Sequence, residues 1–188
     1  MKLKMIATAL VAALSLSLSA EMKVGDVDML LLVRNHPNYD SNKALLTSTD
    51  KDYQKKLEGI KSEGDKLQEE GKKLMEQMRN PMLTAKAKAD VEKELGEIQQ
   101  KLMGVEQRYR AEAMRCRQDL QDLEGRLLKT TTDDLRKRLS AYAQKGGYDF
   151  IYDSNAVPFA KSEYDVTNEM LKEMGVDPKD AKGRDEGK

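Results

Sequence analysis

The chain has 188 residues, with 33 basic and 33 acidic side chains, 35% charged residues, 5% aromatic residues and no tryptophan. So few aromatic residues argue against a large globular core and favour long helices or a coiled coil. The charges are mixed in sign and interleaved with apolar residues, which disfavours extensive disorder. No basic excess exists, so the composition predicts no nucleic-acid partner.

The N-terminal segment has the three-part pattern of a secretory signal peptide. Lys2 and Lys4 precede an apolar stretch over 5–18, and small residues follow up to Ala20. An uncleaved anchor is the alternative, but the apolar stretch is shorter than the roughly 20 residues of a membrane span. We therefore predict an exported protein with a signal peptide over 1–20, cleaved near Ala20. Removing Lys2 and Lys4 leaves 31 basic against 33 acidic residues.

Short strands are predicted on both sides of a central helical region. Alternating apolar and polar residues indicate a strand over 22–29, and aromatic and β-branched residues indicate another over 148–153. A third strand is expected over 156–160, at an edge because it contains Pro158. Together, residues 21–40 and 125–175 are predicted to form a body.

The C-terminal part of this body is expected to end in a helix over 168–174. Thr167 is a candidate N-cap, and Gly175 stands where a C-terminal glycine belongs. Residues 176–188 are polar and contain glycine and proline, so they are predicted to form a disordered tail.

The central region carries two apolar stripes at heptad spacing, which predict two long helices. The first stripe is Leu57, Ile60, Gly64, Leu67, Gly71, Leu74 and Met78, and the second extends from Val91 to Leu127. Asn80 before Pro81 stops the first helix, and Thr84 can cap the second. We predict an antiparallel hairpin arm over 41–124 with its tip at 80–84, in which residue 41 faces roughly residue 123.

Five glycines fall inside the helical pattern, and each costs about 1 kcal/mol relative to alanine in a helix interior. They are Gly59, Gly64, Gly71, Gly96 and Gly104. Two hypotheses remain open: the glycines make the arms flexible, or they let the two helices approach closely.

No enzyme is visible in the sequence. His36, the single histidine, has no companions at metal-ligand spacing, and no Gly-rich phosphate loop is present. We therefore predict no catalytic residues, no metal and no cofactor. The single cysteine, Cys116, falls on the apolar stripe, where a buried free thiol is favoured over a reactive one or an interchain disulfide.

The tip of the hairpin is the predicted surface for binding other proteins. It is basic and rich in methionine, a flexible side chain that promiscuous binding surfaces use often. The candidate residues are Met75, Met78, Arg79, Met82, Leu83, Lys86 and Lys88. Met78 lies on the stripe, so it also fits the end of the helical seam. Four arginines of the second helix, Arg108, Arg110, Arg115 and Arg117, form either a solvated face or a basic lining.

Three segments resemble the Skp/OmpH family of periplasmic outer-membrane chaperones. They are residues 23–29, which look like the family's first strand, residues 80–84, which resemble its hairpin tip, and residues 147–172, which look like its closing strands and helix. The last segment is the most specific.

The resemblance implies an α+β, mostly helical fold, with a long antiparallel coiled-coil hairpin arm on a small β-strand body, assembled as a homotrimer. It implies a periplasmic holdase that binds unfolded outer-membrane proteins between the arms without ATP. The residues expected to join the copies are Val24, Val27, Phe150, Ile151, Val157 and Phe159. Well-known members are strongly basic and this chain is not, so membrane-surface contact is only weakly supported. A structural or adaptor coiled coil of the cell envelope is the alternative function.

Overall fold

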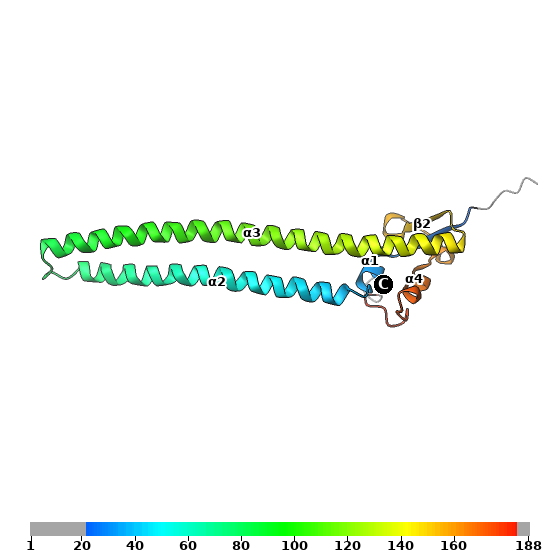
Figure 1. Ribbon diagram of the computed structural model, residues 1–188, viewed down its shortest axis with the longest axis horizontal. Helices are drawn as coiled ribbons and strands as arrows, with labels where there is room; N and C mark the ends of the chain where they lie inside the picture. Colours follow the sequence, from blue (N-terminus) through cyan, green and yellow to red (C-terminus); the bar gives the residue numbers. More distant parts are fainter. Residues whose placement is uncertain (1–21, 184–188) are drawn as a thin grey trace, which may run out of the picture. The chain divides into compact units, whose positions relative to one another are not determined.

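A computed structural model describes residues 22–183, which leaves the predicted signal peptide outside the described residues. The chain divides into two compact units: a body unit, made of the residues up to Asn35 and those from Leu135 onward, and an arm unit, His36–Asp134. The elements, labelled in Figure 1, are β1 (Val24–Val27), α1 (Met29–Arg34), α2 (Tyr39–Met78), α3 (Ala85–Gly146), β2 (Phe150–Asp153), η1 (Ser154–Ala156), η2 (Ser162–Tyr164) and α4 (Thr167–Glu173).

In the arm unit, α2 and α3 run antiparallel and side by side, as the apolar stripes predicted (Figure 1). Gly64 and Gly71 are buried and face Val105 and Ile98 of the opposite helix. These residues belong to the two stripes, so the heptad pattern correctly identified the faces that pack together.

The pairing of the two helices differs from the prediction. Asn42 of α2 hydrogen-bonds to Thr131 of α3, with 3.4 Å between Nδ2 and Oγ1, whereas residue 41 was expected to face residue 123. The reason is an asymmetric tip, because α3 begins beyond the end of α2 (Figure 1). Residues after Gly125 were predicted to belong to the body, but Thr131 has a partner on the first helix, and the arm unit, His36–Asp134, is longer than residues 41–124.

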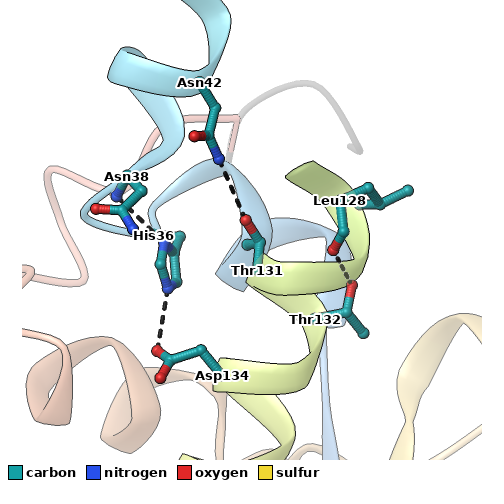
Figure 2. A network of polar contacts seen from close by, with 7 residues as sticks. All are labelled: His36, Asn38, Asn42, Leu128, Thr131, Thr132 and Asp134. Atoms are coloured by element: carbon teal, nitrogen blue, oxygen red, sulfur yellow. Dashed lines mark hydrogen bonds and ion pairs between the residues drawn. The ribbon is translucent and has the colours of Figure 1, made fainter. Parts of the chain in front are cut away.

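The start of the hairpin, just before α2, is held by His36, which is buried (Figure 2). The Nδ1 atom of His36 accepts the backbone N–H of Asn38 at 3.1 Å, so Nε2 carries the ring proton and donates it to Asp134, also at 3.1 Å. The bond to Asp134 joins the segment before α2 to α3, and the bond to Asn38 orders the turn that leads into α2. His36 is therefore a structural residue that fixes the start of the hairpin.

The body unit has a small apolar core built from four of its elements. Its most buried side chains come from β1, α1, α3 and α4, and they are Val27, Leu32, Leu135, Met170 and Leu171. Burying each such aliphatic side chain stabilises the fold by about 1.5–3 kcal/mol. The side chain of Asp28 caps α1 by accepting the N–H of Leu31 at 2.9 Å, which starts that helix directly after β1.

The body contains one parallel two-stranded sheet, in which Val24 pairs with Phe150 and Val27 with Asp153. The chain reaches β2 after α3 ends at Gly146, where Gly147 adopts a φ of 66° that glycine tolerates best. The predicted strand over 156–160 is wrong. Asp153 accepts the N–H of Asn155 and turns the chain into η1, and Pro158 lacks the N–H that a ladder needs.

Two further expectations for the C-terminal part are also wrong. Val166, not Thr167, is the N-cap of α4, and the Thr167 hydroxyl instead accepts the N–H of Asp28 at 2.9 Å. Residues 176–183 were predicted to be disordered, yet Ala181 is only 8% exposed and joins the core. The backbone N–H of Lys182 also donates to Asn35 at 2.8 Å, so the polar composition concealed specific contacts. The rest of the predicted tail, 184–188, lies outside the described residues.

Candidate interaction surfaces

The tip of the arm is an exposed surface that combines methionine with positive charge. We define the tip surface as Met75, Met78, Arg79, Met82, Leu83, Lys86 and Lys88, the set predicted from the sequence. The loop between α2 and α3 exposes 87% of Met82, and Met75 is also exposed. Asn80 shapes this loop, because its side chain accepts the N–H of Met82 at 3.0 Å.

The members of the tip surface differ in how far they are free to bind another molecule. Arg79, Lys86 and Lys88 are exposed, whereas Met78 and Leu83 are half-buried. The half-burial of Met78 agrees with its position on the apolar stripe, so it contributes to the helical seam. Met82, Met75 and the three cations remain the accessible part of the surface.

A second group of exposed apolar side chains lies on α3 and was missed by the sequence analysis. Met103, Met114 and Leu128 are exposed, with 75% of Met114 accessible. At 3.6 residues per turn, their spacing places all three on one face of the helix. These three residues lie outside the heptad stripe in the sequence. Apolar residues outside the stripe point away from the helical seam, so the pattern could have predicted their exposure.

The arginines of α3 lie mostly in ion pairs. Arg108 pairs with Glu63 across the hairpin, Arg110 pairs with Glu106, and the Nε atom of Arg115 lies 3.9 Å from Asp119. Ion pairs this exposed contribute little to stability, but they neutralise the charge. This pattern favours the solvated face over the basic lining.

The five helical glycines fall into two groups. A Cβ atom built on Gly64 would lie 3.4 Å from the Val105 side chain, and one on Gly71 would lie 3.6 Å from Ile98. Gly59, Gly96 and Gly104 have nothing within 4 Å. Close approach of the helices therefore applies only to the first group, and even there the distances are those of ordinary van der Waals contact.

Cys116 is buried in the arm and is a free thiol. Its pKa is raised, first by burial and then by the nearby carboxylate of Glu112. A hydrogen bond from Lys56 holds the pKa of Glu112 below its usual value, so that carboxylate stays ionised beside the thiol. A thiol whose pKa is raised is a weak nucleophile, which agrees with the structural role predicted for it.

The body also carries exposed apolar side chains, on the side of the sheet away from the core. Side chains alternate along a strand; since Val27 lies in the core, Val24 and Asp26 face outward. Their register partners Phe150 and Tyr152 share that face and stack on each other with ring centroids 5.9 Å apart. We call Val24, Asp26, Phe150 and Tyr152 the outer sheet face.

The residues predicted to join copies of the chain do not all lie on this side. Val24 and Phe150 belong to the outer sheet face, and Val157 and Phe159 line a hollow beside it, with 80% of Phe159 exposed. Val27 is only 1% exposed and lies in the core, whereas Ile151 is half-buried and packs against the same core. The sequence analysis missed Tyr152 and Tyr164, which line the hollow.

No group of three or more histidine, cysteine, aspartate or glutamate side chains among residues 22–183 could hold a metal ion. None of the helices described combines the length and hydrophobicity that a membrane crossing requires.

The fold and its surfaces define a class of protein that combines a long helical hairpin with a small mixed α/β body and has exposed apolar side chains suited to contact with other proteins. A family model for OmpH-like outer membrane proteins matches residues 23–174. The match covers most of the chain, so the protein belongs to the OmpH-like outer membrane protein family, and the resemblance found in the sequence is confirmed. No individual curated protein matches the chain.

Proposed function

We propose that this protein is an ATP-independent holding chaperone of the periplasm that binds unfolded outer-membrane proteins between the arms of a homotrimer. The observation that carries the proposal is the family match over residues 23–174, which spans both the arm and the body. Membership of this family supports a chaperone role in handling outer-membrane proteins.

The arm supplies the surfaces for capturing a client. Because the hairpin is only two helices thick, many apolar side chains stay exposed; they include Met75, Met82, Met103 and Met114. Unbranched methionine side chains adapt to partners of different shape. Arg79, Lys86 and Lys88 add positive charge at the tip, where unfolded acidic or apolar segments are the fitting clients.

The body supplies the surface for assembly. Its sheet has two strands of four residues each, and a sheet this small is marginal without further strands or packing. Phe150, Tyr152 and Phe159 are exposed in the single chain, so association of copies would bury them. Assembly also gives several arms that act on one client, which raises overall affinity without new contacts.

The decisive experiment measures aggregation of an unfolded β-barrel protein, diluted from urea, by light scattering with the mature chain present and no ATP. We expect delayed aggregation at a stoichiometric amount of trimer. A chain that is trimeric by sedimentation but never delays aggregation would favour the alternative, a structural or adaptor protein of the envelope. A chain that stays monomeric at micromolar concentration would contradict the proposed assembly.

Variants of the tip surface test where the client binds. Replacing Met75 and Met82 with serine removes exposed apolar area without touching the seam, so we expect weaker suppression of aggregation at unchanged thermal stability. Met78→Ser is the matched control for the seam, because its half-buried side chain should lower stability instead. Equal suppression by Met75→Ser/Met82→Ser and the unmodified chain would exclude the tip as a binding surface.

A further inference from the structure

The outer sheet face contains one acidic side chain in an otherwise apolar setting. Asp26 is only 8% exposed, and its Oδ1 atom accepts no hydrogen bond from any described residue. It is one of the residues that line the hollow of about 480 Å³ beside the sheet. The other walls are mainly apolar or aromatic, including Val24, Tyr152 and Phe159. A buried carboxylate oxygen without a hydrogen-bond partner lowers the stability of the fold. An uncharged side chain at this position would avoid that cost.

The surroundings of Asp26 oppose its negative charge. Burial, and then repulsion by Asp165, raise the pKa of the Asp26 carboxyl. Asp165 lies on the segment that bridges to β1 beside Asp26, where the N–H of Val166 donates to the Asp26 carbonyl oxygen at 2.9 Å. Lys161 also lines the hollow, but its Nζ atom lies 3.3 Å from Glu163. The remaining titratable groups at the hollow are the hydroxyls of Tyr152 and Tyr164.

Several features indicate that a second copy of this chain covers the outer sheet face. The hollow and the exposed ring of Phe150, which does not line it, occur on the same body, so one copy can offer this ring to the hollow of the next. A head-to-tail contact of this kind joins two different patches and can close into a ring of copies. The face is also short of charge, with Asp26 as its single ionisable carboxyl, which suits a surface that becomes buried.

We infer that the outer sheet face is covered by a second copy of this chain and that Asp26 takes up a proton as it is covered, so that the assembly is tighter in acid than at neutral pH. The inference rests on the proposed assembly and adds the residue that regulates it. Asp26 thereby acts as a proton-sensitive element in the contact between copies.

The direction of the pH dependence of association follows from proton linkage. Covering the face removes more solvent from Asp26 and raises its pKa beyond the already raised value in the separated chain. The assembled state then binds more protons, so the association constant increases as pH falls toward that raised pKa and levels off below the pKa of the separated chain. Each covered Asp26 contributes at most about a tenfold change per pH unit.

The test is sedimentation equilibrium of the mature chain between pH 5 and pH 7.5, at constant ionic strength. We expect tighter association of the unmodified chain at the acidic end. Asp26→Asn removes the charge at nearly constant size, so it should associate at pH 7.5 about as tightly as the unmodified chain does at pH 5, with little pH dependence. Glu173→Gln is the matched control, since it makes the same charge change at an exposed side chain of the body unit that does not line the hollow, and it should keep the original pH dependence.

The outcomes separate this inference from the proposed function. Assembly that is independent of pH, that weakens in acid, or that keeps its pH dependence in Asp26→Asn refutes the role of Asp26 and leaves the chaperone proposal intact. A chain that stays monomeric throughout the pH range refutes the assembly itself. Asp26→Val is a second variant in case the asparagine is poorly tolerated; it should also associate tightly at pH 7.5.

Discussion

Replacing the three solvent-facing glycines of the arm with alanine tests the hypothesis that these glycines make the helices flexible for the capture of clients. Gly59, Gly96 and Gly104 have open space where a Cβ atom would go, so the change adds no clash and removes only the helix penalty of glycine. At about 1 kcal/mol each, the triple variant should be more stable by about 3 kcal/mol. For a chain of this size that corresponds to an increase in Tm of roughly 6–12 °C.

The assay is thermal unfolding followed by the helical circular dichroism signal, together with aggregation suppression for clients of different size. If flexible arms serve capture, the triple variant should lose its largest or smallest clients while gaining stability. An unchanged client range would refute the flexibility hypothesis, and an unchanged Tm would refute the energetic argument.

The double variant Gly64→Ala/Gly71→Ala is the comparison for close helix approach. Its added methyl groups would meet Val105 and Ile98 at ordinary contact distances, so it should also gain stability. A loss would show that the seam depends on glycine at these two positions.

Four further predictions concern single residues. Leu135→Ala should destabilise the body by about 2–5 kcal/mol, since it leaves a cavity beneath a fully buried side chain, and urea unfolding measures the loss. His36→Phe should lower the free energy of unfolding by about 1–3 kcal/mol, because the N–H of Asn38 loses its acceptor. The control Thr132→Val loses only a hydrogen bond within its own helix, so its free energy of unfolding should change by no more than about 0.5 kcal/mol. Cys116 should react with iodoacetamide much more slowly in the folded chain than in urea, and equal rates would contradict its burial. Because the folded chain has a raised pKa at Asp26, its stability falls as pH rises through that value, so Asp26→Asn should be the more stable variant at neutral pH and lose this advantage in acid.

The arm was largely predictable from the sequence because its contacts repeat. Each turn of a paired helix places one stripe residue against the partner, so the spacing of Gly64, Gly71, Ile98 and Val105 specifies the packed face. The register of α2 against α3 was not predictable, because it depends on the length and conformation of the loop that joins them at the tip. That conformation is set by local contacts such as the one between Asn80 and Met82, which leave no periodic signal.

The body was harder to predict because its contacts join distant parts of the chain. The pairing of β1 with β2 is parallel and spans the whole arm in sequence, and nothing local specifies which strand is the partner. The segment after residue 176 looked disordered for the same reason, because its order depends on contacts with Asn35. The alternation over 22–29 did reveal the strand, but it could not show that Asp26 would be buried without a hydrogen bond.

The tip surface and the outer sheet face belong to different units, so their contributions to the proposed function can be tested separately. The tip surface lies in the arm unit and the outer sheet face in the body unit, each with its own internal packing. A substitution at Met82 removes exposed area without reaching the core around Leu135, and a substitution at Asp26 leaves the helical seam unchanged. Capture of a client and association of copies can therefore be weakened one at a time. If loss of assembly alone abolishes holding, several arms acting together must supply most of the affinity, as expected for a chain with equal numbers of basic and acidic residues.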